Sequence, residues 1–364
     1  MSSKSFYISV NRDGVSPSAG ELHVNMIRYN TGCCSKYAKS DVCIDMGISL
    51  KLRGNEINIL LYVPFAIEWS QRNCGISDLG HILSKDRALV SSLFNEELSV
   101  KEITQVPAFY QLEKQTSGSS VPFKILYVLN RTNFEKMELD PSDKGTLVKI
   151  KIPVIDLNPL RGSSVDDSAK KTENDAGKGA NPVSEDMVYI RFRIKTDGRH
   201  DGVKSLITSE RLNNDVIRGV FEKTDLFDIR VNDRRLVSDK EMEALIHGGT
   251  HQLLTFEKVH FFYITDVRER IHGGLLPLKD TRILEPETWC DYLKALNDSS
   301  RKIAYHWKSK NEGNEVCDKY CNFFKGDNHS VRVGLLLLYF LIVIALGAIG
   351  SGLGSWVCKL LGIC

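Results

Sequence analysis

The longest apolar run in the chain lies near its C-terminal end. Residues Val333 to Ile349 read VGLLLLYFLIVIALGAI and include no charged side chain. Continued to Trp356, the run reaches the ~20 residues that a helix needs to cross the hydrocarbon core of a bilayer. We therefore predict a transmembrane helix over residues 330–356, followed by a short extracytoplasmic tail at residues 357–364.

The rest of the chain is dominated by the two-residue periodicity of β-strands. Alternating or β-branched apolar runs predict strands at residues 5–11, 21–29, 42–52, 57–65, 123–130, 146–157, 187–196, 227–231 and 253–267. Helical patterns are fewer, at residues 78–93, 238–246 and 287–296, and the second begins with the capping box Ser238-Asp-Lys-Glu. Because strands crowd the first 160 residues, we predict a β-rich α+β fold, with sandwich-like sheets and a few helices.

A polar segment at residues 161–186 interrupts the pattern. It holds almost no large apolar side chain, so it cannot bury enough surface to offset its ordering entropy. We interpret it as a disordered linker between a β-rich lobe at residues 1–160 and a second α+β lobe at residues 187–297. A long hairpin loop inside one domain is the alternative. Residues 298–329 then form a basic and aromatic neck, in which Trp307, Phe323 and Phe324 suit the membrane interface.

The distribution of charge predicts the orientation of the chain. A net charge of +2 argues against a globally basic nucleic-acid binder. The first residues, MSSKSFYISVNRDG, lack the apolar core of a signal peptide. Lysine and arginine accumulate before the apolar run, whereas only Lys359 follows it. We expect a single-pass protein of the inner (plasma) membrane with a cytoplasmic N-terminal region.

Motifs for catalysis or metal binding are missing from the sequence. The nine cysteines are irregularly spaced, which together with a cytoplasmic location predicts free thiols. Cys317 and Cys321 have no second pair of ligands nearby that would complete a zinc site. No phosphate-binding loop, H-E-x-x-H or G-x-S-x-G motif occurs. We therefore expect no enzyme, no cofactor and neither catalytic nor metal-ligating residues.

A basic strand face is the candidate ligand site. Alternation along residues 189–195 places the cationic residues on one side of a strand and Ile190, Phe192 and Ile194 on the other. If this strand pairs with the one before the polar segment, an anion would relieve the repulsion between like charges. The predicted site comprises Lys149, Lys151, Tyr189, Arg191, Arg193, Lys195 and Arg199. A solvated sheet face balanced by carboxylates is the alternative.

Small residues gather in the distal half of the apolar run. Gly347, Gly350 and Gly354 are among them, and the last two form a G-x-x-x-G pair. Small residues let helices approach closely, and helix association in lipid depends on such packing. We predict a homo-oligomer whose transmembrane helices pack through these three glycines.

This arrangement resembles the membrane effectors of bacterial anti-phage defence, and in particular the Hailong-type channel effectors. The resemblance rests on the span at residues 333–349, its glycines, and the basic residues at 149–151 and 191–195. It implies a cytosolic region that senses a nucleotide or short oligonucleotide made by a partner nucleotidyltransferase. It also implies that the transmembrane helices form or gate a pore in response.

Two other classes of function fit the same sequence. The first is a tail-anchored adaptor or scaffold, in which the helix only localises a part that binds protein or anionic lipid. The second is a membrane-attached hydrolase with a site that the motifs do not reveal. Binding of short oligonucleotides separates the sensor from the adaptor.

Overall fold

The computed structural model describes most of the chain. The described residues are 5–13, 18–31, 39–51, 56–69, 75–104, 106–116, 119–139, 145–153, 187–195, 206–210, 222–294, 296, 300–309, 316–329 and 333–361. They divide into two compact units. The larger unit comprises residues up to Leu206, Asp228–Val267 and Gly274–Phe323. The smaller unit comprises Ile207–Phe227, Arg268–Gly273 and the chain from Phe324 onwards.

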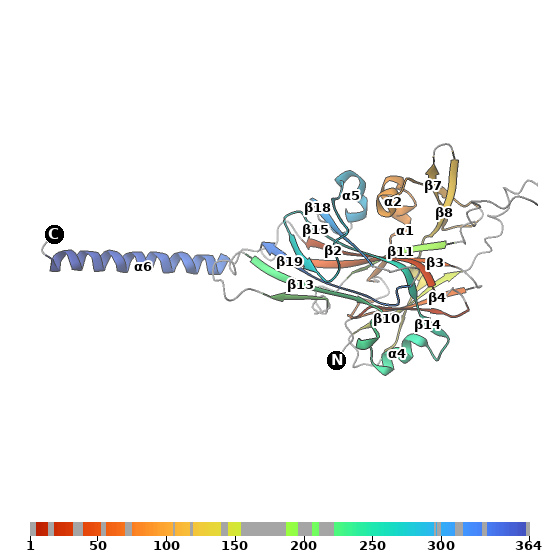
Figure 1. Cartoon of the computed structure of the whole chain (residues 1–364), viewed down its shortest axis with the longest axis horizontal. Coiled ribbons are helices and arrows are strands. Elements are labelled where there is room, and N and C mark those ends of the chain that lie inside the picture. Colours follow the sequence, from red (N-terminus) through yellow and green to blue (C-terminus); the bar gives the residue numbers. More distant parts are fainter. Residues whose placement is uncertain are drawn as a thin grey trace, which may run out of the picture. The chain divides into compact units, whose positions relative to one another are not determined.

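A ten-stranded sheet forms the centre of the larger unit (Figure 1). Its order is β17 (Asp280–Ile283), β18 (Lys302–Lys308), β15 (Thr255–Asp266), β2 (Ser18–Thr31), β3 (Lys39–Lys51), β11 (Met187–Lys195), β8 (Ser119–Tyr127), β7 (Phe109–Thr116) and β6 (Leu98–Glu102). The tenth strand, β5 (Ile76–Asp78), also pairs with β11. Most neighbours are antiparallel, but β15 and β2 run parallel, as do β11 and β8.

A second sheet of five strands packs against the first. It contains β14 (His251–Leu253), β1 (Tyr7–Asn11), β4 (Glu56–Val63), β10 (Thr146–Pro153) and β9 (Phe134–Met137), in that order. The rings of Phe134 in β9 and Phe192 in β11 meet at 6.2 Å between centroids. Strand β4 is apolar on both faces, as expected for a strand with a layer packed on each side, and Ile59 and Leu60 are both buried.

Helices cover the outer faces of the two sheets (Figure 1). Helices α1 (Gly80–Leu83), α2 (Arg87–Phe94) and α5 (Pro286–Lys294) pack on the ten-stranded sheet, and α4 (Asp239–Ile246) packs on the five-stranded sheet. Helix α2 begins where the Asp86 carboxylate accepts the Leu89 N–H, and it ends at Asn95, whose φ of 54° is left-handed. The described residues of this unit also include two short 3₁₀ turns, η1 (Arg131–Asn133) and η4 (Arg234–Leu236).

A four-stranded sheet includes the strands of the smaller unit. Its order is β12 (Ile207–Glu210), β13 (Glu222–Val231), β19 (Tyr320–His329) and β16 (Arg270–Gly274). Phe227 and Phe324 stack in parallel at 4.6 Å between ring centroids. The chain then continues into α6 (Val333–Leu360), the longest helix that the structure describes.

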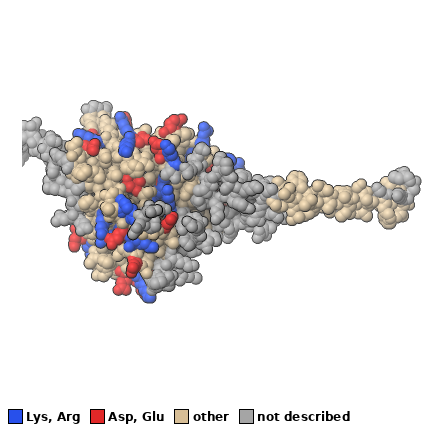
Figure 2. All heavy atoms as spheres, turned by 180° about the vertical axis from the view of Figure 1, so that it is seen from behind, with Lys and Arg blue, Asp and Glu red and all other residues tan. Residues whose placement is uncertain are grey.

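Helix α6 confirms the predicted apolar helix. Its segment Leu336–Cys358 has 23 residues and a mean hydropathy of 2.4, and none of it is buried against the rest of the chain. This segment is long and apolar enough to cross a membrane. Figure 2 shows lysine, arginine and carboxylate side chains interspersed over the larger unit, and none along the described part of the helix.

The β-rich α+β fold class is confirmed, but the chain is divided differently from the prediction. Strand β11 lies next to β3, and β15 lies next to β2, so strands from both predicted lobes share one sheet. Strand partners are chosen by tertiary packing, which a linear pattern does not report. The predicted linker, residues 161–186, lies outside the described residues.

The predicted membrane-proximal neck also needs a correction. Residues 302–308 form β18 inside the ten-stranded sheet, and Trp307 is only 2% exposed. Phe324 is buried as well, whereas Phe323 is exposed. The aromatic residues were assigned to the interface because lysines lie beside them. Trp307 and Phe324 instead fill the interior.

Candidate ligand-binding site

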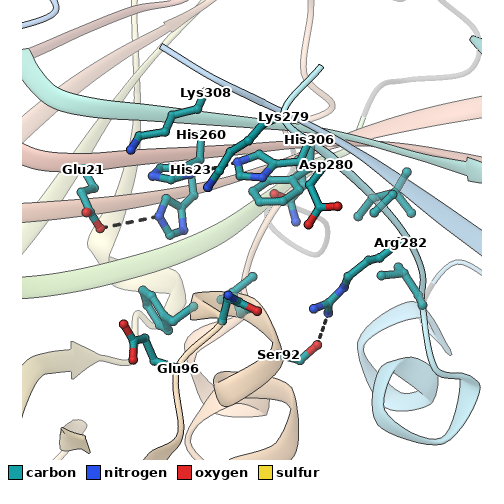
Figure 3. Close-up of a pocket in the computed structure, with 18 of the residues that line it drawn as sticks. Glu21, His23, Ser92, Glu96, His260, Lys279, Asp280, Arg282, His306 and Lys308 are labelled. Carbon is teal, nitrogen blue, oxygen red and sulfur yellow. Dashed lines mark hydrogen bonds and ion pairs between the residues drawn. The ribbon is translucent and has the colours of Figure 1, made fainter. Parts of the chain in front are cut away.

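A cavity of about 400 Å³ lies on the helix-covered side of the ten-stranded sheet. Its floor is made by β2, β15, β18 and β17, and residues of α2 and α5 form its walls (Figure 3). All of its lining residues belong to the larger unit. The cavity falls within the ~300–1,000 Å³ range that is typical of small-molecule sites.

Strand register brings three histidines together on the floor. His23 of β2 lies opposite His260 of β15, and Phe262, two residues further along β15, lies opposite His306 of β18. Because alternate residues of a strand share a face, these side chains all project towards the helices (Figure 3). His23, His260 and His306 together are called the histidine row.

The rings of the histidine row form a continuous contact. The centroids of His23 and His260 are 5.1 Å apart, and those of His260 and His306 are 5.2 Å apart. Phe262 stacks on His306 at 4.2 Å and 9° between planes. His260 Nδ1 lies 3.0 Å from His306 Nε2, so one of these nitrogens donates a hydrogen bond to the other.

The histidine row is neutral at neutral pH. Burial lowers the pKa of His23 to about 4, that of His260 to about 3 and that of His306 to about 4, because a charged imidazolium loses hydration there. The row therefore offers ring surface and uncharged hydrogen-bonding groups. It is not a set of cations.

Two lysines supply positive charge at the edge of the cavity. Lys279 and Lys308 line it and have no ion pair among the residues that the structure describes. Lys258, in contrast, lies 3.4 Å from Glu21, which also accepts a 2.8 Å hydrogen bond from Lys124. His23 and Lys124 hold the pKa of Glu21 far below its usual range, because both favour the charged carboxylate.

The carboxylates that line the cavity are largely engaged by other groups. Glu96 pairs with Lys114 at 2.6 Å, and Glu21 is held as described above. Asp280 accepts the N–H of Thr281 and lies at the same edge as Lys279.

Arg282 contacts the Ser92 hydroxyl of α2, which also accepts a 3.2 Å hydrogen bond from Trp289 of α5. Ser92 thereby connects the two helical walls.

Two buried polar atoms of the floor lack a partner. His23 Nδ1 and Asn25 Oδ1 form no hydrogen bond with any described residue, although His23 is 5% exposed and Asn25 only 2%. Both residues line the cavity. A buried polar group without a partner costs about 1–3 kcal/mol, so these two atoms reduce the stability of the floor.

The predicted basic face is arranged differently. Strand β10 pairs with β4 and β9, and β11 pairs with β3, β5 and β8, so Lys149 and Lys151 do not share a sheet with β11. Lys151 is instead paired with Glu135 at 2.7 Å. Lys195 lies at the exposed end of β11, and Arg199 lies outside the described residues.

The arginines of β11 are buried and not exposed as predicted. Arg193 binds both oxygens of Asp45, at 2.7 and 2.9 Å, and Arg191 donates to the hydroxyls of Tyr189 and Tyr292. The predicted alternation along β11 is correct. The prediction failed on burial, because α5 covers the face of the sheet that carries these arginines.

The cavity was missed in the sequence because its residues come from distant segments. One signal was present: Glu21, His23 and Asn25 alternate with apolar residues, as do Lys258, His260 and Phe262. Such alternation predicts a strand with one polar face, but it does not show that two polar faces lie side by side. Among the described residues, no group of three histidine, cysteine or acidic side chains is arranged to hold a metal ion.

Comparison with known proteins adds no family to this picture. No protein-family model matches the chain, and no curated protein matches it either. The chemistry of the site therefore rests on its own residues. They combine stacked neutral rings and two lysines, an arrangement suited to binding a planar, anionic small molecule.

Proposed function

We propose that this protein is a membrane-anchored receptor for a nucleotide or short oligonucleotide. The observation that carries the proposal is the cavity, in which the histidine row lies beside Lys279 and Lys308. In this proposal the ring of the ligand lies against the histidines and aromatic side chains, and its phosphate lies at the lysines. The apolar segment of α6 anchors the receptor.

Aromatic surface in the cavity supports a ligand with a planar ring. Phe94, Phe123, Phe262 and Trp289 line it together with the histidine row. Stacking of a base on an aromatic side chain contributes about 1–3 kcal/mol. Because the histidines are neutral, they favour a ring over an isolated phosphate, which would gain more from charged side chains.

The lysines support the anionic part of the ligand. Lysine binds phosphate as a point charge, and a hydrogen bond to a charged group contributes about 1.5–3 kcal/mol. Neither Lys279 nor Lys308 is neutralised by an ion pair within the described residues. The edge of the cavity therefore favours a negative group, while the floor is uncharged.

The proposal also includes a response at the membrane. The resemblance in arrangement implies that α6 self-associates into a pore. It also implies control by a partner nucleotidyltransferase and a role in anti-phage defence. A Cβ atom added to Gly347, Gly350 or Gly354 would meet no neighbouring atom within 4 Å apart from the backbone of α6 itself, so this surface is available to another helix. These steps stay predictions until association of α6 is measured.

Calorimetric titration of the full chain in lipid nanodiscs tests the proposed ligand. We expect adenosine 5′-monophosphate or a pool of deoxytetranucleotides to bind saturably. The double variant Lys279→Gln/Lys308→Gln should weaken binding by about tenfold or more, because two charge-assisted contacts are lost. Lys149→Gln/Lys151→Gln, on the other sheet, is the matched control and should bind like the wild type.

Failure to bind either probe would contradict the proposal and favour the adaptor, in which the soluble part binds protein or anionic lipid. Equal loss of binding in both double variants would show a general electrostatic effect. The cavity would then not be the binding site.

A further inference from the structure

An apolar loop is exposed between β16 and β17. Its residues 275–278 read Leu-Leu-Pro-Leu, and the two residues before them are glycines. Leu275 is 67% exposed, Leu278 is 47% exposed, and Pro277 is exposed as well. Single exposed leucines are ordinary on protein surfaces, whereas neighbouring ones form a patch of the kind that marks an interaction site.

Backbone hydrogen bonds hold the two ends of this loop. The Leu275 N–H donates to the Phe323 carbonyl at 2.8 Å, and the Lys279 N–H donates to the His306 carbonyl at 2.8 Å. The loop is therefore attached to β19 at one end and to β18 at the other. Exposure of its leucines belongs to this defined conformation.

Phe323 extends the apolar surface next to Leu275. It is 40% exposed, whereas its neighbours in β19, Asn322 and Phe324, are almost completely buried. Because side chains alternate along a strand, Phe323 points away from the interior that these two residues fill. Residues 275–278 and Phe323 are together called the apolar loop patch.

The chain itself keeps the apolar loop patch close to the membrane helix. Phe323 stands only ten residues before Val333, the first residue of α6. A fully extended chain of this length spans at most about 36 Å. A bilayer that α6 enters is therefore present at a high effective concentration around the patch, as for any tethered partner.

The composition of the loop also suits a lipid surface. Lys279 directly follows Leu278, is exposed and has no ion pair among the residues that the structure describes. Leucine and phenylalanine beside a cation are the combination that interfacial membrane segments use, with the apolar side chains below the headgroups and the cation among them.

We propose that the apolar loop patch inserts into the interfacial layer of the bilayer and gives the protein a second membrane contact besides α6. The proposal goes beyond the nucleotide receptor and does not depend on it. It has one consequence for the cavity. Lys279, Asp280 and Arg282 line the cavity and follow the loop directly, so the contact holds this edge of the cavity at the membrane surface (Figure 3).

Photocrosslinking of the full chain in nanodiscs of anionic phospholipid tests the contact. The protein would be produced with a diazirine analogue of leucine, irradiated and digested with trypsin. We expect lipid adducts on the peptide of residues 271–279, and on the leucines of α6 as the internal positive control. Leu275→Asn/Leu278→Asn should reduce the adducts on this peptide severalfold. Val121→Asn, which removes another exposed apolar side chain, is the matched control and should leave them unchanged.

Each other product would overturn the proposal. Water adducts alone on residues 271–279 would show that the loop faces solvent. Crosslinks from this peptide to other peptides of the chain would show that protein covers it, and mixing with ¹⁵N-labelled chains would tell whether a second copy does so. Absence of lipid from α6 as well would also contradict the anchor. Nucleotide binding is measured separately, and circular dichroism melting identifies any variant that does not fold.

Discussion

At the scale of single residues, a network of buried, hydrogen-bonded polar side chains lies under α5. Arg193 and Asp45 form a two-point ion pair, and the Tyr292 hydroxyl donates to Asp45 at 2.7 Å. All three side chains are almost completely buried. Breaking a buried pair leaves a charge without compensation, which costs far more than losing an exposed pair.

Asp45→Asn should therefore reduce the free energy of unfolding by about 3–5 kcal/mol, because Arg193 loses its buried counter-charge. Lys151→Gln removes the exposed pair with Glu135 and should cost less than about 1 kcal/mol. Urea unfolding followed by circular dichroism measures both. Similar losses in the two variants would contradict the role of the buried network.

The histidine row makes stability depend on pH. The pKa values of its members in the folded protein, about 3 to 4, lie below the ordinary value of 6.5, so the unfolded chain binds more protons between these limits. The contribution of the neutral histidines to the free energy of unfolding is therefore fully present above about pH 6.5, and it decreases as the pH falls towards 4. Thermal melting should show a shallower decrease for His260→Gln/His306→Gln. An unchanged slope would mean that these two histidines have the same pKa values in the folded and the unfolded chain, which contradicts the lowered values.

At this scale, the sequence predicted which side of a strand each side chain lies on, but it did not predict which of these side chains are buried. Alternation correctly placed Tyr189, Arg191 and Arg193 on one side of a strand. It could not show that α5 covers that side, because Asp45 and Tyr292 are distant in sequence. Charged residues are usually exposed, and the expectation of a basic surface followed this general rule. The two arginines are an exception to it.

At the scale of elements, local signals were the most reliable. The capping box at Ser238 is present, with Ser238 Oγ accepting from the Glu241 N–H, and α4 ends at Ile246 as predicted. Strands β11 and β15 lie within a few residues of their predicted ranges. Strand β18 was missed because its lysines and aromatic residues were read as a membrane-proximal neck.

Helix α6 carries the prediction at this scale. Leu341 and Ile344 are both exposed in its apolar segment, and arginine at such positions costs about 2.5–3.5 kcal/mol per residue on insertion. Leu341→Arg/Ile344→Arg should therefore shift the protein from the carbonate-resistant membrane fraction into the soluble fraction. Val121→Arg, an exposed site on β8, is the control and should not change the distribution. Normal membrane retention of the double variant would contradict anchoring by α6.

At the scale of the whole molecule, long-range pairing builds the candidate site. Strands β2, β15 and β18 are neighbours in the sheet although more than half of the chain separates β2 from β15. No local pattern encodes such a pairing, so the histidine row could not be assembled from the sequence. The fold class and the apolar helix were predictable because each depends on local periodicity and composition.

The central claim is that the cavity over the histidine row binds a nucleotide, and photolabelling tests it most directly. The full chain in nanodiscs would be irradiated with 8-azidoadenosine 5′-monophosphate and the labelled peptides identified by mass spectrometry. The account predicts labelling within β15, β18 or α2 that unmodified nucleotide suppresses. Labelling at residues 149–151, or no labelling that the nucleotide suppresses, would contradict it.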